Sequence, residues 1–110
     1  MSLGEAWRSV AMGSISASTT GVAIPVNTNL STGIDVYMVR VTNTDASIRC
    51  HYLEPEDVAD TVTETDGAPI KADADANSLF GPRKATGTDP QVASASGTPT
   101  VTYTVYERNA

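Results

Sequence analysis

The feature that most restricts the fold of this chain is a two-residue alternation of apolar and polar side chains. The clearest example is the segment 101–106, VTYTVY, which follows a turn-like SGTP. Successive side chains of a strand point to opposite faces of a sheet, so this period is typical of strands. The apolar residues nowhere keep the i, i+3, i+4, i+7 spacing of an amphipathic helix over several turns. We therefore predict an all-β fold.

Turn-forming residues divide the chain into about seven short strands at spacings of roughly 8–15 residues. The expected strands are 6–16, 21–26, 34–43, 47–54, 68–73 and the two arms of a hairpin within 91–108, with SGTP as its turn. Gly13 is a candidate break in the first strand, and 77–90 is expected to be a strand end followed by a loop. The segment 34–43 is apolar on both faces near its centre, which predicts a central strand with 47–54 as its antiparallel partner.

These strands predict one domain, residues 1–110, folded as an antiparallel β-sandwich or a jelly-roll-like barrel. Two interpretations of the N-terminal residues remain open. Trp7 either belongs to the first strand and fills the core, or it lies on an arm, residues 1–10, that docks on a neighbouring chain.

The charge of the chain argues against two classes of partner. The formal net charge is −6, with 13 acidic residues against 7 Lys and Arg. A nucleic-acid-binding protein needs a basic face, and so does a protein that docks on an anionic membrane. We also find no signal peptide or apolar membrane span, and Cys50 is the single cysteine. We therefore expect a soluble protein made in a cytoplasm, with neither nucleic acid nor membrane as partner.

The segment KADADANSLFG has oxygen-bearing residues at every second position, Asp73, Asp75 and Asn77, as at the start of a calcium loop. An EF-hand loop also needs a Gly at position six and a bidentate Glu at position twelve. Counted from Asp73, these positions hold Ser78 and Lys84. We therefore predict a solvated strand or turn here, with no metal and no cofactor. A weaker calcium site, shared with the acidic loop 54–66 or a neighbouring subunit, is the alternative.

No set of residues in the sequence predicts an enzyme. His51 is the single histidine and lies beside Cys50, so in a strand the two side chains face opposite ways. Most of the acidic residues lie between 54 and 75, where paired carboxylates could serve glycoside hydrolysis only within a cleft. The same acidic stretch leaves one alternative open, a small carbohydrate-binding or calcium-dependent binding module.

Three phrases give a family resemblance: DVYMVRVTNTDASIRCHY, GAPIKADADANSLFG and QVASASGTPTVTYTVYERNA, in this order along the chain. Over residues 34–108 the chain resembles small bacteriophage virion proteins that fold as a β-sandwich. The resemblance implies a non-enzymatic structural protein of the virion, assembled in the host cytoplasm. It implies most specifically a capsid decoration, or cement, protein that binds the outside of the head as a dimer or trimer. Its partners would be the major capsid protein or other virion proteins, and a tail, connector or head-fibre component is the alternative.

The sequence also suggests where such a protein would touch its partners. Trp and Arg are the preferred anchors of interfaces, and an acidic loop can meet basic patches of a capsid. The candidate interface residues are Trp7, Arg8, Asp57, Arg83 and Lys84.

Overall fold

The computed structural model describes residues 7–45, 47–54, 68–70 and 78–108. Within these ranges the chain forms eight strands: β1 (Trp7–Ser16), β2 (Val22–Ala23), β3 (Val36–Asn43), β4 (Cys50–Leu53), β5 (Ala68–Ile70), β6 (Ser78–Lys84), β7 (Gln91–Ser94) and β8 (Thr100–Arg108). A search of the same residues for a helix that could span a membrane finds none. The expected candidates Asp57, Asp73, Asp75 and Asn77 lie outside the described residues.

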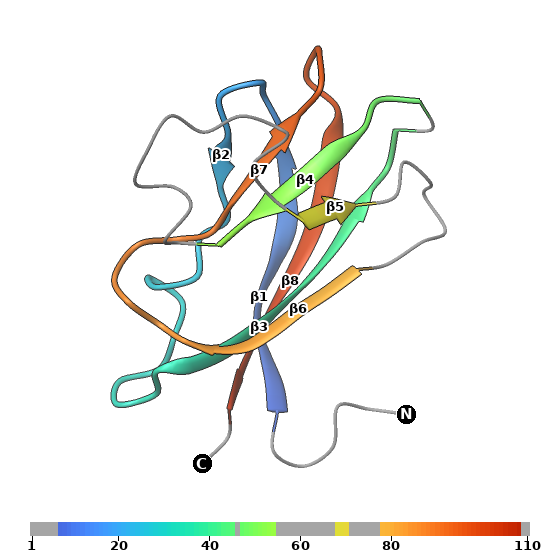
Figure 1. Cartoon of the computed structure of the whole chain (residues 1–110). Helices are drawn as coiled ribbons and strands as arrows, with labels where there is room; N and C mark the ends of the chain where they lie inside the picture. Colours follow the sequence, from blue (N-terminus) through green and yellow to red (C-terminus); the bar gives the residue numbers. More distant parts are fainter. Residues whose placement is uncertain (1–6, 46, 55–67, 71–77, 109–110) are drawn as a thin grey trace.

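The strands form two four-stranded sheets, with the orders β1-β8-β3-β6 and β2-β7-β4-β5. All strand pairs within the sheets are antiparallel. Strands that follow each other in the chain lie in different sheets, except β4 and β5. This order is that of a jelly roll, and Figure 1 shows β4 and β7 in front of β1 and β8. The prediction of an all-β antiparallel sandwich is confirmed.

Two predicted strand pairings are wrong, although the strands themselves form. The segment 47–54 contains β4 but does not pair with β3, whose neighbours are β8 and β6. The expected hairpin within 91–108 also does not form, because β7 pairs with β2 and β4 whereas β8 pairs with β1 and β3. In both places the chain crosses from one sheet to the other.

The crossing after β3 has a physical cause in the side chains of its turn. Asn43 is buried; its Nδ2 donates to the carbonyl oxygen of Ile48 at 2.7 Å, and its Oδ1 accepts from the backbone N–H of Asp45 at 3.0 Å. Asp45 Oδ1 accepts from the backbone N–H groups of Ser47 and Ile48, each at 2.8 Å. These bonds satisfy the backbone locally, so the turn closes without a ladder between β3 and β4.

The ends of the first sheet also differ from the sequence expectation. β1 runs through Gly13 without a break and is irregular instead between Ser9 and Ala11. Residues 7–10 belong to this strand, and residues 1–6 of the expected arm lie outside the described residues. The segment expected as a strand end and loop begins with a full strand, β6, which contains Pro82. Pro is tolerated there because β6 is at the edge of its sheet.

The hydrophobic core lies between the two sheets. Its buried cluster comprises Ala17, Ile24, Val26, Tyr37, Val39, Val41, Cys50, Tyr52, Ile70, Val92, Val101 and Val105. An aromatic pair joins the layers, since the ring of Tyr52 in β4 stacks on that of Phe80 in β6 with centroids 4.0 Å apart. Val101 and Val105 of β8 are buried, as the alternation in 101–106 predicts, and Glu107 is buried on the same face. Thr100 and Thr102, on the opposite face of β8, are exposed.

Candidate binding surface

The surface of interest is the outer face of the sheet β1-β8-β3-β6, which we call the outer face. Val39, Val41, Val101 and Val105 point into the core, so by alternation and register their neighbours point outward. The outer face consists of Trp7, Ser9, Met12, Ser14 and Ser16 from β1; Thr100, Thr102, Thr104, Tyr106 and Arg108 from β8; Val36, Met38, Arg40 and Thr42 from β3; and Leu79 and Lys84 from β6.

Large apolar side chains reach solvent on this face. Met12 is 72% exposed and Leu79 is 46% exposed, and they are the exposed large hydrophobic residues among those the structure describes. Trp7 and Tyr106 are partly buried on the same face. Trp, Tyr, Met and Arg are residue types enriched at protein interfaces, so their presence makes the outer face a candidate contact surface.

The charges of the outer face are all positive, although the chain as a whole carries −6. Arg40, Arg108 and Lys84 point outward, and the outer face as defined above contains no carboxylate. Lys84 Nζ lies 3.7 Å from Asp35 Oδ2 at the rim, but both side chains are well exposed, so the pair is screened by water. The guanidinium carbon of Arg40 lies 5.5 Å from the centroid of the Tyr106 ring, a cation–π contact.

A shallow, open hollow of about 570 Å³ lies on the outer face. Its lining is Met12, Gly13, Arg40, Thr42, Thr102, Tyr103 and Thr104. The Arg40 guanidinium offers N–H donors, and each threonine offers a hydroxyl that can donate or accept. The hollow therefore combines a cation, several hydroxyls and the apolar side chain of Met12.

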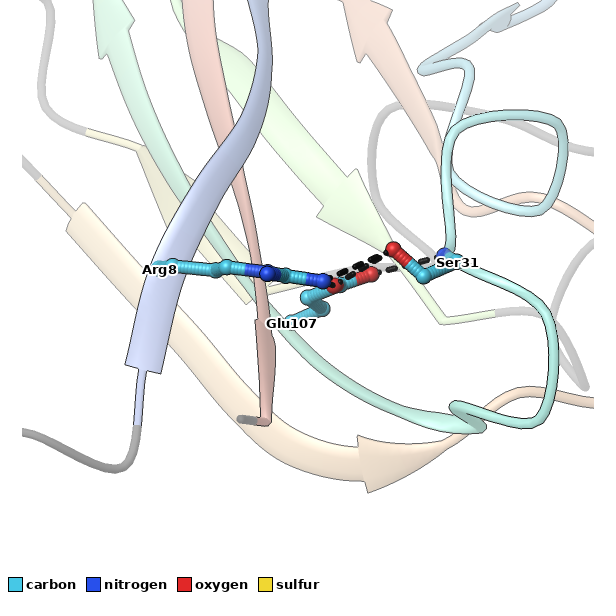
Figure 2. A network of polar contacts seen from close by, with 3 residues as sticks. All are labelled: Arg8, Ser31 and Glu107. Carbon is cyan, nitrogen blue, oxygen red and sulfur yellow. Dashed lines mark hydrogen bonds and ion pairs between the residues drawn. The ribbon is translucent and has the colours of Figure 1, made fainter. Parts of the chain in front are cut away.

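Glu107 forms a polar network at one end of the sandwich, which Figure 2 shows with its partners Arg8 and Ser31. Its carboxylate is fully buried and accepts from Arg8 Nε at 2.7 Å. It also accepts from the backbone N–H and the hydroxyl of Ser31, each at 2.7 Å. Burial by itself raises the pKa of Glu107, but the hydrogen bonds from Ser31 and Arg8 outweigh it and hold the pKa below its ordinary value. The network fastens the connection between β2 and β3 to β1 and β8.

A second ion pair, between Arg83 and Glu54, lies near the aromatic stack of the core. Arg83 is opposite Tyr37 in the register of β3 and β6, so it faces the inner side of the sheet. Burial, with further contributions from Tyr37 and Glu54, raises the pKa of the Tyr52 hydroxyl. Arg83 and Glu54 thus close one margin of the core and do not belong to the outer face.

The structure describes four of the five predicted interface residues, all except Asp57, and divides them into two groups. Trp7 and Lys84 lie on the outer face, whereas Arg8 and Arg83 form ion pairs within the domain. The central residues Arg40 and Tyr106 were missed by sequence reasoning. The alternation of side chains along each strand is enough to predict that Arg40 and Tyr106 point away from their valine neighbours and toward solvent. Only the pairing of β3 with β8 brings the two side chains together.

Two titratable residues of β4, Cys50 and His51, are neighbours in the chain. Cys50 is buried, and His51 is next to it with its side chain partly exposed. Within the described ranges no group of three or more His, Cys, Asp and Glu side chains could hold a metal ion.

Comparison of the chain with protein-family models, with curated proteins and with solved structures finds no match. The likeness to small phage virion proteins therefore depends on the quoted phrases alone and stays a prediction.

Proposed function

We propose that this chain is a non-enzymatic structural protein of a phage virion, a capsid decoration protein that binds the outside of the head. The observation that carries the proposal is the outer face, a regular sheet surface with exposed Met12 and Leu79, a central Arg40–Tyr106 pair and no carboxylate. The partner in this proposal is the major capsid protein, and the protein joins the virion in the host cytoplasm. The jelly-roll order supports the proposal only at the level of fold, because such folds serve capsids and lectins alike.

The size of the outer face suits such a contact. The four strands have 10, 9, 8 and 7 residues, and at about 3.3 Å per residue and about 4.8 Å between strands they cover roughly 540 Å² in projection. Side-chain relief adds to this area, which brings it near the ~800 Å² per partner of a stable protein interface. The outer face alone can therefore support specific docking.

A dimer or trimer belongs to the same proposal, and the edge strand β1 supports it. Among the described strands β1 pairs only with β8, so one side of its backbone is free of strand partners. The segment 11–16, AMGSIS, contains neither a charge nor a proline, the usual protections of an edge. β6, at the other edge, contains Pro82 and two basic residues. An edge of the β1 kind suits pairing between copies of the chain.

The test is the number of copies per particle. Virions assembled from the genome that encodes this chain are purified, and the chain is quantified against the major capsid protein by mass spectrometry. A decoration protein is expected in a fixed high ratio to the capsid protein, on the outer surface of the head by immunogold labelling. A few copies at one vertex would favour the tail, connector or head-fibre alternative, and absence from the particles would refute a virion role.

A second candidate function, a carbohydrate-binding module, is favoured by one observation, the hollow lined by Thr42, Thr102 and Thr104. Hydroxyl-bearing hollows on a jelly roll can hydrogen-bond sugars, as lectin domains do. A glycan array, probed with and without calcium, tests this candidate. Binding to a defined glycan that is lost in Thr102→Val would support it, and an array without hits would remove it.

A further inference from the structure

We propose that the hollow on the outer face receives a carboxylate side chain from an acidic surface of the partner protein, with Arg40 as its anchor. The inference rests on the proposed function in one respect, because it names the chemistry of the surface that the outer face meets. It goes further by assigning a specific pairing to the hollow and by predicting a strong salt dependence for the contact.

Arg40 is held ready for such a pairing. It lies in β3, inside the sheet, between Val39 and Val41, which are both fully buried, so its backbone position is fixed by the core. Its guanidinium lies over the ring of Tyr106. A guanidinium stacked by its face keeps the N–H groups of its edge available, and these match the two oxygens of a carboxylate. The ion pairs between described residues involve Arg8, Arg83 and Lys84, and none of them includes Arg40.

The neighbours of Arg40 complete a carboxylate site. Thr42 lies on the same strand and Thr102 and Thr104 on β8, and all three line the hollow with Arg40. The Thr104 hydroxyl can donate to a carboxylate oxygen that the guanidinium leaves unsatisfied, whereas the Thr102 hydroxyl lies 3.5 Å from the Thr42 carbonyl oxygen, to which it donates. Met12 lines the hollow as well and would exclude water from one side of the pair. An ion pair is stronger when water is partly removed around it.

Charge complementarity favours an acidic protein surface over the other occupants. If two copies of the chain packed their outer faces together around a two-fold axis, Arg40, Arg108 and Lys84 of one copy would face the same three cations of the other. These like charges would repel each other. A nucleic acid is best bound by an extended basic face, whereas the outer face offers three cations, Arg40, Arg108 and Lys84. An acidic patch on another protein meets these cations and avoids the like-charge contact of two copies.

The first experiment measures binding to undecorated heads built from the major capsid protein of the same genome. Cosedimentation is compared for the full-length wild type, Arg40→Gln and the control Arg49→Gln at low and high NaCl. Arg49 is exposed and precedes β4 in the other sheet, so its variant changes the net charge equally without touching the outer face. We expect Arg40→Gln to weaken binding about tenfold to a hundredfold and to flatten the salt dependence, and Arg49→Gln to bind as wild type. Equal binding by all three proteins overturns the inference while leaving decoration intact.

The second experiment decides the inference even if the wild type does not bind heads, an outcome that would count against decoration itself. Backbone and arginine side-chain NMR signals are followed at low salt while poly-L-glutamate, poly-L-lysine or inorganic phosphate is added. We expect shifts at Arg40, Thr102 and Thr104 with poly-L-glutamate alone, and their loss in Arg40→Gln. The inference is overturned if these signals do not move, or if they move equally with phosphate, which would indicate a general anion site.

Light scattering on the same proteins tests the remaining occupant, a second copy of the chain. We expect Arg40→Gln to have the native mass of the wild type, whatever oligomer the wild type forms. A lower mass for Arg40→Gln would show that the outer face is a contact between copies, and would overturn the assignment to an acidic partner.

Discussion

Replacing Glu107 by Gln is the sharpest test of what fastens one end of the sandwich. Glu107 Oε2 accepts from Arg8 Nε and from the Ser31 hydroxyl, and Oε1 accepts from the Ser31 backbone N–H. Gln has the same size but only one acceptor oxygen, and its NH2 group must face a donor. In one orientation the amide oxygen accepts from the Ser31 backbone N–H, and the NH2 group then faces Arg8 Nε, which is also a donor. In the flipped orientation the oxygen accepts from Arg8 Nε, and the Ser31 N–H has no acceptor.

The magnitude follows from these bonds. Losing one hydrogen bond to a charged group costs about 1.5–3 kcal/mol, and this is at the lower end here because the Arg8 side chain is 53% exposed and regains water. The bonds that remain change from a charged to a neutral acceptor, which costs up to about 1 kcal/mol more. We therefore expect Glu107→Gln to lower the free energy of unfolding by about 2 kcal/mol. For 110 residues this corresponds to a fall in Tm of about 9 °C.

The assay is urea unfolding of the full chain, followed by the fluorescence of its single tryptophan, Trp7, and by circular dichroism. Asp35→Asn is the matched control, since it makes the same acid-to-amide change in an exposed pair with Lys84. We expect this control to stay within about 0.5 kcal/mol of the wild type. Suppose instead that Glu107→Gln lowers the free energy of unfolding no more than Asp35→Asn does. In that case the free-energy cost of burying the carboxylate cancels the gain from its hydrogen bonds, and the reasoning is refuted.

The pH dependence of stability gives an independent check on the same carboxylate. The pKa of Glu107 in the folded protein lies below its ordinary value of 4.5, so the unfolded chain binds the proton more readily. The stabilisation is therefore fully present above pH 4.5 and is lost as the pH falls through the lower, folded pKa. The difference in unfolding free energy between wild type and Glu107→Gln should shrink as the pH is lowered from 4.5 to the folded pKa of Glu107. A difference that stays constant with pH would contradict this account.

Three further outcomes are expected from the structure and the sequence. A Cβ at Gly13 would lie 2.9 Å from the Tyr103 hydroxyl oxygen, so Gly13→Ala should cost about 1–2 kcal/mol in urea unfolding, and less in a Tyr103→Phe background. The thiol of Cys50 is fully buried, so it should react with a thiol reagent only as fast as the protein unfolds; rapid labelling of the native protein would contradict its placement. Because the segment 73–84 lacks the residues of a calcium loop, Tm should be the same with calcium and with a chelator, and a fall on chelation would revive the calcium alternative.

The sequence predicts the strands well because a strand's alternation is a local property. Val101 and Val105 point inward as the period of two requires, and β3 is a central strand, as its apolar residues on both faces predict. The partner of a strand is not local. β4 follows β3 after a short turn and was expected beside it, but the side chains of Asn43 and Asp45 satisfy the turn so that β4 begins in the other sheet.

The same distinction explains what could be predicted of the binding surface. The choice of Trp7 as an interface residue needed only its type, whereas recognising Arg40 needed a partner strand from the far end of the chain. The contacts of the two other arginines that the sequence singles out, Arg8 and Arg83, also depend on the fold. Arg8 and Arg83 form ion pairs with Glu107 and Glu54, two acids that are distant in sequence and that no local pattern connects to them.

The binding role that we propose for the outer face depends on the core beneath it. Thr104 precedes the fully buried Val105, and Arg40 lies between two fully buried valines, so neither can shift without disturbing the packing between the sheets. A surface built in this way is already ordered before a partner arrives, and docking does not have to pay the entropy of fixing a loop. For the same reason, substitutions of outward residues such as Arg40 should change binding and leave the unfolding free energy almost unchanged, whereas substitutions of their inward neighbours should do the reverse.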